Sequence, residues 1–420
     1  MLRAIILFPT LLTALCGMGR VCEVYSGGSI EQALATTMDC DTVRVHAGVY
    51  NEGPITITRP VVLLGESWPV IDGGGKGEVI VVKAPHVTIR GLVVRGTAIS
   101  DINDNAAIKC ISVTDITIAG NRIEDSFFGI YLSSVARASV SDNRVIGDAA
   151  TPEGRRANGI HLWKCAHVSV ERNTVMHHRD GIYLEFVTDS RIEGDTSAYN
   201  SRYGLHFMFS HRDRYMRNVF RNNGAGVAVM FTHDVIMADN HFEENRGASS
   251  YGLLLKEIND ATITGNVFAD NTVGILIDGC NRAQVKDNLF HANGWAVRLL
   301  ANSLDCVFDG NSFRSNTFDM TTNGDLVKST LRNNYWDRYR GYDLDHDGRG
   351  DVPHRPMSVF GAVTERAPYA MVLSRSLMVD LLDQAERIVP TLTPSTCAAC
   401  APLTPAALED RSPLMHPPHG

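Results

Sequence analysis

Residues 203–220 read YGLHFMFSHRDRYMRNVF, and they are one copy of a pattern that recurs along most of the chain. Each copy opens with Gly and alternating apolar residues, as also in DGIYL (180–184), AGVAV (225–229) and YGLLL (251–255). Most copies place an Asn at the same later point, and Asp195 occupies that point in one copy. The spacing is mostly 22 or 23 residues, which predicts a solenoid of stacked coils. The recurring asparagines are Asn121, Asn143, Asn173, Asn218, Asn240, Asn266, Asn288, Asn311 and Asn333.

Two kinds of solenoid share this period, because VSVERNTV (168–175) also fits the core of a leucine-rich repeat. Each copy, however, holds G-I-x-L, then V-x-V, then N-x-V or N-x-F, and no stretch has helical spacing. Three short strands per coil predict an all-β fold, a right-handed parallel β-helix. We expect the Asn residues to turn the corner in the left-handed backbone region and to stack from coil to coil.

The two ends of the chain lack the regular repeat. Arg3 followed by an apolar run predicts a secretory signal, and Leu15 before Cys16 argues against a lipoprotein signal. A short helix over 29–38 is expected to cap the first coil. The helix near the other end is either a cap or a docking helix for a membrane-embedded partner. The predicted divisions are a signal peptide at 1–19 with an open cleavage site, N-terminal cap and first coils at 20–120, regular coils at 121–340, an Asp-rich loop and cap at 341–368, an amphipathic helix at 369–389, and an extended tail at 390–420.

The net charge of the chain argues against one class of partner, nucleic acids. The formal net charge is -8 at pH 7 and no basic block occurs, so the sequence offers no phosphate-binding surface and we expect no nucleic-acid partner. After the signal, no segment reaches the ~20 apolar residues of a membrane span. The sequence therefore predicts an exported protein.

Soft metal ligands fall at outward positions of neighbouring coils. In G-I-x-L the residues two and four after Gly should point outward, which places His206 and Met208 outside one coil and Met230 outside the next. A Met is usually core filler, but other copies place Glu185 and Lys256 at this position, so it should face solvent. Thioether with imidazole suits copper, above all Cu(I). Three further imidazoles are candidates at outward positions: His161, His211 and His233.

Two other motifs carry potential ligands. In DLDHDGRGDVPH (343–354), the residues Asp343, Asp345, Asp347 and Asp351 match positions of a calcium loop, but the last position holds His354 instead of Glu. A hydrogen-bonded acidic turn is the alternative. Cys397 and Cys400, in CAAC, are either a thiol redox pair or a soft-metal site.

Several segments together resemble one family. These are VIDGGGKGEVIVVKAPHVTIRGLVVRG, NGIHLW, LHFMF, VMFTHD, NNYWDRYRGYDLDHDGRGDVPHRP and SPLMHPP. Over nearly all the mature chain, the sequence resembles NosD, a family of periplasmic proteins that mature nitrous oxide reductase. His206 and Met208 lie in LHFMF, Met230 lies in VMF and His161 lies in HLW. His211 and His233 rest on geometry alone, and the Cys pair departs from the family.

This resemblance implies a location and partners. It implies a periplasmic protein associated with the inner membrane through an ABC transporter, which has one membrane-spanning subunit and one ATPase. It also implies receipt of copper from a lipoprotein chaperone and delivery toward the copper centres of the reductase.

Two other functions fit a parallel β-helix. A polysaccharide lyase, epimerase or hydrolase needs two carboxyl groups, or a carboxylate or metal beside a base, facing one groove. The outward positions offer Glu185 near Tyr183 and His161 but no second acid in the adjoining pairs. We therefore predict that the chain is not an enzyme. The other alternative is a passive scaffold for protein partners.

Overall fold

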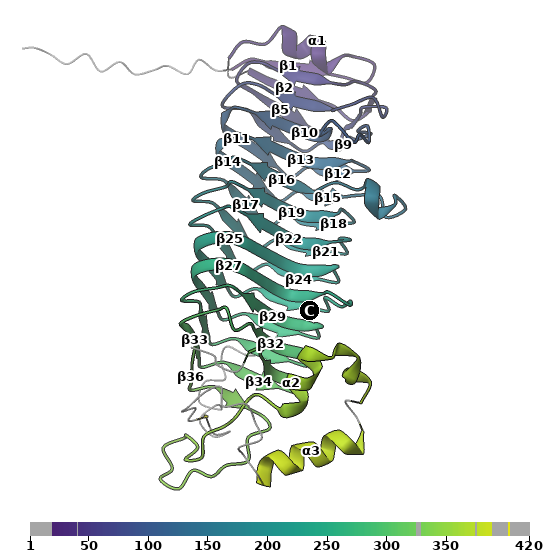
Figure 1. Cartoon of the computed structure of the whole chain (residues 1–420). Coiled ribbons are helices and arrows are strands. Elements are labelled where there is room, and N and C mark those ends of the chain that lie inside the picture. Colours follow the sequence, from purple (N-terminus) through teal and green to yellow (C-terminus); the bar gives the residue numbers. More distant parts are fainter. Residues whose placement is uncertain (1–18, 40, 325–328, 374–375, 389–401, 404–420) are drawn as a thin grey trace, which may run out of the picture.

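The computed structural model describes residues 19–39, 41–324, 329–373, 376–388 and 402–403. Residues 1–18 of the predicted signal peptide lie outside these residues, as do Cys397, Cys400 and all of the predicted tail at 390–420 except 402–403. Within them the chain forms one long parallel β-helix, as the repeat predicts (Figure 1). None of the helices in the described part of the chain combines the length and the apolar composition of a membrane span.

The strands stack into two sheets, one of 24 strands and one of 13 strands. Most coils give two strands to the larger sheet and one to the smaller.

The larger sheet consists of β1 (Val21–Val24), β2 (Asp41–Val45), β4 (Ile55–Ile57), β5 (Val61–Gly65), β7 (Ile80–Val82), β8 (Thr88–Arg90), β10 (Ala106–Ile111), β11 (Thr114–Ala119), β13 (Phe128–Ser133), β14 (Ala136–Ser141), β16 (Ile160–Trp163), β17 (Ser169–Glu171), β19 (Asp180–Glu185), β20 (Arg191–Glu193), β22 (Tyr203–Met208), β23 (Arg214–Met216), β25 (Ala225–Ala238), β27 (Tyr251–Thr264), β29 (Val273–Asp278), β30 (Gln284–Lys286), β32 (Trp295–Leu299), β33 (Cys306–Asp309), β35 (Phe318–Thr321) and β36 (Ser329–Arg332). The smaller sheet consists of β3 (Val49–Tyr50), β6 (Val70–Asp72), β9 (Val93–Arg95), β12 (Arg122–Glu124), β15 (Arg144–Ile146), β18 (Thr174–Met176), β21 (Thr196–Ala198), β24 (Val219–Arg221), β26 (His241–Glu243), β28 (Val267–Ala269), β31 (Leu289–His291), β34 (Ser312–Arg314) and β37 (Tyr335–Trp336).

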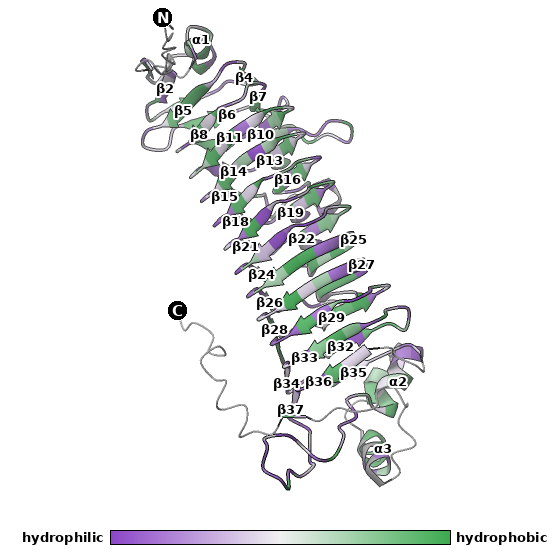
Figure 2. Cartoon of the chain, turned by 90° about the vertical axis from the view of Figure 1, so that its left-hand side faces the viewer, coloured by the Kyte–Doolittle hydropathy of each residue, from purple (hydrophilic) through white to green (hydrophobic). Residues whose placement is uncertain are grey.

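Apolar and polar residues alternate along the strands (Figure 2). The apolar ones form the buried core inside the coils. In β22, Leu205 and Phe207 are fully buried inside. Aromatic rings stack along the interior of the later coils, with neighbouring centroids 4.1–5.6 Å apart. These rings belong to Phe220, Phe242, Phe268, Phe290, Phe313 and Trp336.

The repeated Asn residues form the expected ladder, with one correction to its backbone. The main-chain nitrogen of Asn218 donates to Oδ1 of Asn240 at 3.0 Å, and the same link repeats between the ladder residues from 121 to 311. The last acceptor is Oδ1 of Asn334, at 3.0 Å from the main-chain nitrogen of Asn311, so the prediction of Asn333 as a member is wrong by one residue. The left-handed conformation belongs to the residue before each Asn, as in Arg217 with φ 56° and Asp239 with φ 56°. Each ladder Asn itself keeps a negative φ, and its buried side chain reaches the neighbouring coil.

A second ladder, which the sequence did not predict, stacks at another corner. The main-chain nitrogen of Asn200 donates to Oδ1 of Asn223 at 3.0 Å, and the same link repeats in the following coils. Each Asn side chain supplies hydrogen bonds to main-chain groups of the buried turn, which would otherwise have no partner. Its members are Asn200, Asn223, Asn245, Asn271, Asn293 and Asn316.

Helices cover both ends of the solenoid. The short helix α1 (Ile30–Ala35) lies over the first coil, and the Ser29 side chain accepts a hydrogen bond at its N-terminus. One 3-10 turn, η1 (Glu153–Arg155), lies in a loop between coils. At the far end, α2 (Val359–Arg366) packs on the last coils, where Arg298 pairs with Glu365 at 2.6 Å.

The helix expected over 369–389 is divided in the structure. A 3-10 helix, η2 (Pro368–Leu373), precedes α3 (Leu377–Ile388). Val379 of α3 is buried against Phe318 and Phe360, so α3 contributes to the cap. Other large apolar side chains here stay exposed, including Tyr369 at 91% and Leu377 at 74%.

Candidate metal site

Met208 and Met230 are direct partners in the register between β22 and β25. Both side chains are half-buried on the outer face of the sheet, as the phase counted from Gly predicts. In the same column, Glu185 neighbours Met208 and Lys256 neighbours Met230. The hydroxyl of Tyr183 donates to the sulfur of Met208 at 3.8 Å. Two thioethers therefore lie on adjacent strands of one surface.

His206 also points away from the core, but it does not face water. Its exposed fraction is only 3%, because the rings of Tyr183 and Tyr203 each lie 4.8 Å from the imidazole. The expectation that this outward position faces solvent is therefore wrong for His206. Neither ring nitrogen has a hydrogen-bond partner. A buried imidazole with two unsatisfied nitrogens is unusual, and a bound metal ion is one arrangement that would satisfy it.

Asp180, at the start of β19, is a buried acid next to His206. It is 0% exposed, and its Oδ2 lies 3.6 Å from Nδ1 of His206. The same oxygen lies 3.6 Å from Nε of Arg179. Its Oδ1 accepts a hydrogen bond from the main-chain nitrogen of Tyr203 at 3.3 Å. The repeat phase does not predict this acid as part of the site, because Asp180 precedes the Gly from which the outward positions follow.

His161 belongs to the same outward column but not to the same metal site. Its ring lies between Tyr131 and Tyr183, at centroid distances of 4.6 and 4.7 Å. Tyr183 separates it from His206 in the stack, so one ion cannot bind both imidazoles. The His161 ring is 9% exposed and its Nε2 has no partner. Burial lowers the pKa of His161 to about 3, which keeps the imidazole neutral.

His211 and His233 form a separate pair beyond the next turn. Their rings are stacked, with centroids 4.1 Å apart. Nδ1 of His233 lies 2.7 Å from the carboxylate of Asp234. Partial burial and the neighbouring imidazole lower the pKa of His211. These two rings are side by side, as predicted from the repeat phase.

An aromatic ladder lies between the methionines and this His pair in the sequence. Phe209 stacks on Phe186 and on Phe231, with centroids 5.3 and 5.0 Å apart. All three adopt the left-handed backbone conformation. Sequence reasoning missed them, although Phe recurs five residues after Gly in three successive coils.

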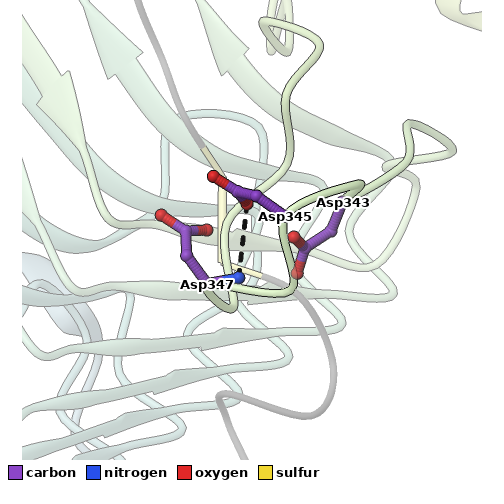
Figure 3. A group of neighbouring side chains, drawn as sticks. All are labelled: Asp343, Asp345 and Asp347. Atoms are coloured by element: carbon purple, nitrogen blue, oxygen red, sulfur yellow. Dashed lines mark hydrogen bonds between the residues drawn. The ribbon is translucent and has the colours of Figure 1, made fainter.

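The Asp-rich loop holds three of the four predicted acids together. Oxygens of Asp343, Asp345 and Asp347 lie within 4.8 Å of one another (Figure 3). Asp351 instead accepts a hydrogen bond from the main-chain nitrogen of Leu344 at 2.7 Å. His354 packs against Trp336 with centroids 5.1 Å apart, and burial lowers its pKa to about 4. The loop is therefore an acidic turn that could accept a cation.

Sequence comparison identifies relatives of similar length. A chain named "Probable ABC transporter binding protein NosD" from Pseudomonas aeruginosa is 29% identical over 365 residues, covering 82% of this chain and 84% of the relative. A chain of the same name from Stutzerimonas stutzeri is 27% identical over 369 residues, covering 83% of each chain. Among solved structures, the Dettilon tailspike protein gp208 has a TM-score of 0.53 at 12% identity, with 72% of this chain and 64% of that chain covered. This last likeness supports the fold alone.

The family model described as "Periplasmic copper-binding protein (NosD)" matches residues 141–343. That range contains the coils with His206, Met208 and Met230. With the two relatives, which extend the similarity over most of the sequence, this match supports membership of the chain in the NosD family of periplasmic copper-binding proteins.

Proposed function

We propose that this protein binds Cu(I) through His206, Met208 and Met230 and transfers it during the maturation of nitrous oxide reductase. The observation that carries the proposal is the register pairing of Met208 with Met230 next to an imidazole whose two nitrogens lack partners. Thioether and imidazole are ligands that suit Cu(I) and serve calcium or magnesium poorly.

The different burial of the three side chains gives the proposed site an order of contact. The thioethers are half-buried and the imidazole is almost fully buried. An arriving Cu(I) ion meets the two sulfurs first and gains the imidazole when Tyr183 or Tyr203 moves aside. The stacked pair of His211 and His233 supplies further donors on the exposed surface. His161 is too far along the stack to join the first site and acts separately.

The relatives' names support a transporter as partner. We infer that this chain docks on an ABC transporter through the exposed apolar side chains of η2 and α3, including Tyr369, Val372, Leu377, Met378 and Leu381. In the described residues, several large apolar side chains of η2 and α3 are exposed at one end of the solenoid, and exposed apolar surface of this kind is typical of a protein interface. In this arrangement the copper surface lies along the solenoid flank, where a lipoprotein chaperone delivers the ion and the reductase receives it.

Copper content of the reductase tests this function in cells. We expect reductase purified from cells that carry only the variant His206→Ala, Met208→Leu, Met230→Leu to contain less copper than reductase from cells with the unmodified chain. The control is Met176→Leu in β18 of the other sheet, which should leave the copper content unchanged. Equal copper with the triple variant would contradict the proposal.

The enzyme alternative receives less support from the geometry. Asp180 adds a carboxylate near Tyr183 and His206, but this carboxylate is fully buried and the imidazole is almost fully buried. A polysaccharide has no access to these groups in this arrangement. Calcium at Asp343, Asp345 and Asp347 is proposed only as a stabiliser of the Asp-rich loop.

A further inference from the structure

The imidazoles of His161 and His206 are joined by a chain of polar contacts that runs around Tyr183. Nδ1 of His161 lies 3.1 Å from Nδ2 of Asn158. Oδ1 of Asn158 accepts a hydrogen bond from Nη2 of Arg179 at 3.1 Å. Nε of Arg179 and Nδ1 of His206 both lie 3.6 Å from Oδ2 of Asp180. The proposed copper ligand His206 thus shares one carboxylate oxygen with a guanidinium.

Asp180 is held in place and yet incompletely bonded. Its Oδ1 accepts a hydrogen bond from Tyr203 N, whereas Oδ2 has no hydrogen bond at all. Nε of Arg179 and both ring nitrogens of His206 also have none. A buried polar atom without a hydrogen-bond partner destabilises the folded state, because it has lost its bonds to water and gained none in return. Their concentration at one point indicates a group whose bonds are completed when a ligand binds.

We propose that Asp180 is a positioning residue for copper binding and that Arg179 opposes it. This inference rests on the proposed function. Asp180 attracts the proton of His206 to Nδ1, which leaves the Nε2 lone pair for the ion. A carboxylate behind a ligating imidazole fixes the tautomer and increases the basicity of the ligand. It also places a negative charge near a monovalent cation in a poorly hydrated site, where charges interact strongly.

Arg179 acts in the opposite direction through the same oxygen. Its guanidinium neutralises part of the charge of Asp180 and repels an incoming cation. Asn158 anchors the far side of the guanidinium, so Arg179 remains next to Asp180. When copper occupies Nε2, Asp180 Oδ2 shifts its contact from Arg179 toward His206 Nδ1. The balance between the two contacts sets how tightly the ion is held, which suits a protein that must release its cargo.

Two substitutions with opposite expected effects test this arrangement. Asp180→Asn keeps the bond to Tyr203 but removes the charge, and we expect Cu(I) affinity of the full mature chain to fall about 10- to 100-fold. Arg179→Gln keeps a hydrogen-bond donor for Asn158, and we expect affinity to rise several-fold. Affinity is measured by competition with a Cu(I) chelator, and thermal unfolding confirms the fold of each variant.

Matched controls come from the exposed pair Asp189 and Arg212, which are bonded at 2.8 Å on the same flank. Asp189→Asn and Arg212→Gln should leave affinity unchanged. In the metal-free protein, nitrogen-15 NMR should show the Nδ1–H tautomer of His206, with the other tautomer gaining population in Asp180→Asn. A merely structural role for Asp180 would not produce this change.

The outcomes separate the two proposals. The proposed role of Asp180 is wrong if Asp180→Asn binds copper like the unmodified chain, or if Arg179→Gln weakens binding. This holds even when the triple variant of His206, Met208 and Met230 loses copper. If the triple variant keeps full affinity, the copper site itself is wrong. Should Asp180→Asn fail to fold, the direction of the Arg179→Gln effect decides.

Discussion

Asp195 occupies a place in the Asn ladder and accepts hydrogen bonds from the main-chain and side-chain nitrogens of Asn173, at 2.6 and 2.9 Å, through one oxygen. Its other oxygen has no partner. At the equivalent place in the next coil, the side-chain nitrogen of Asn218 donates a hydrogen bond to the carbonyl oxygen of Ile192 at 3.0 Å. An ionised Asp cannot make that bond, and burial raises the pKa of Asp195 to about 7.

We expect Asp195→Asn to stabilise the protein at neutral pH and to reduce the pH dependence of its stability. The folded pKa lies above the unfolded value of about 3.9, so the folded state holds a proton that the unfolded state has lost. The contribution of Asp195 to the free energy of unfolding therefore decreases as the pH rises from about 4 to about 7, by up to about 1.4 kcal/mol per pH unit. Above about pH 7 this contribution no longer changes. Thermal midpoints of both proteins from pH 4 to 8 check this. Asp239→Asn, at an exposed position, is the control, and parallel pH curves for Asp195→Asn and the unmodified protein would refute the assignment.

The ladder should matter for stability wherever it is interrupted. Asn240→Ala removes the side-chain bonds to Tyr215 O at 3.0 Å and to Asn266 at 2.9 Å, and leaves Asn218 without its acceptor. We expect a loss of about 2–4 kcal/mol, because buried groups remain unpaired. Urea denaturation measures it. Asn281→Ala, which breaks one exposed bond to Asn259, should cost about 0.5 kcal/mol or less, and similar losses for both variants would count against the ladder.

The apolar side chains of α3 should affect partner binding more than folding. Replacing Leu377, Met378 and Leu381 with Ser should greatly reduce recovery of the transporter's membrane subunit in a pull-down from membranes. The thermal midpoint should change little, because Val379, which packs on the cap, is kept. Ile102→Ser, at an exposed apolar residue near the other end, is the control. Undiminished recovery with the α3 variant would exclude this docking surface.

Calcium should stabilise the Asp-rich loop if the acidic turn binds it. We expect millimolar Ca²⁺ to raise the thermal midpoint of the unmodified protein and to have little effect on Asp345→Asn, because that variant loses one of the three clustered carboxylates. Asp234→Asn, away from the loop, serves as control. An equal response of all three proteins would mean that calcium acts elsewhere.

The sequence predicted the solenoid because a short period forces every coil to bury the same positions. The phase from Gly also placed Met208 and Met230 together, since register in a stack follows the repeat. Burial of His206 was not predictable in this way, because Tyr203, whose ring packs against the imidazole, begins the strand before the Gly from which the outward positions follow. Asp180 was missed for the same reason. The phase gives the direction of a side chain but not which neighbouring side chains pack around it.

Direct titration with Cu(I) against a competing chelator tests the central claim most directly. The unmodified mature chain should take Cu(I) from the chelator, and the variant His206→Ala, Met208→Leu, Met230→Leu should bind at least about 100-fold more weakly, since it loses all three proposed ligands while Met→Leu preserves side-chain volume. Met176→Leu should behave like the unmodified chain. Equal affinity of the triple variant and the unmodified chain would contradict the account.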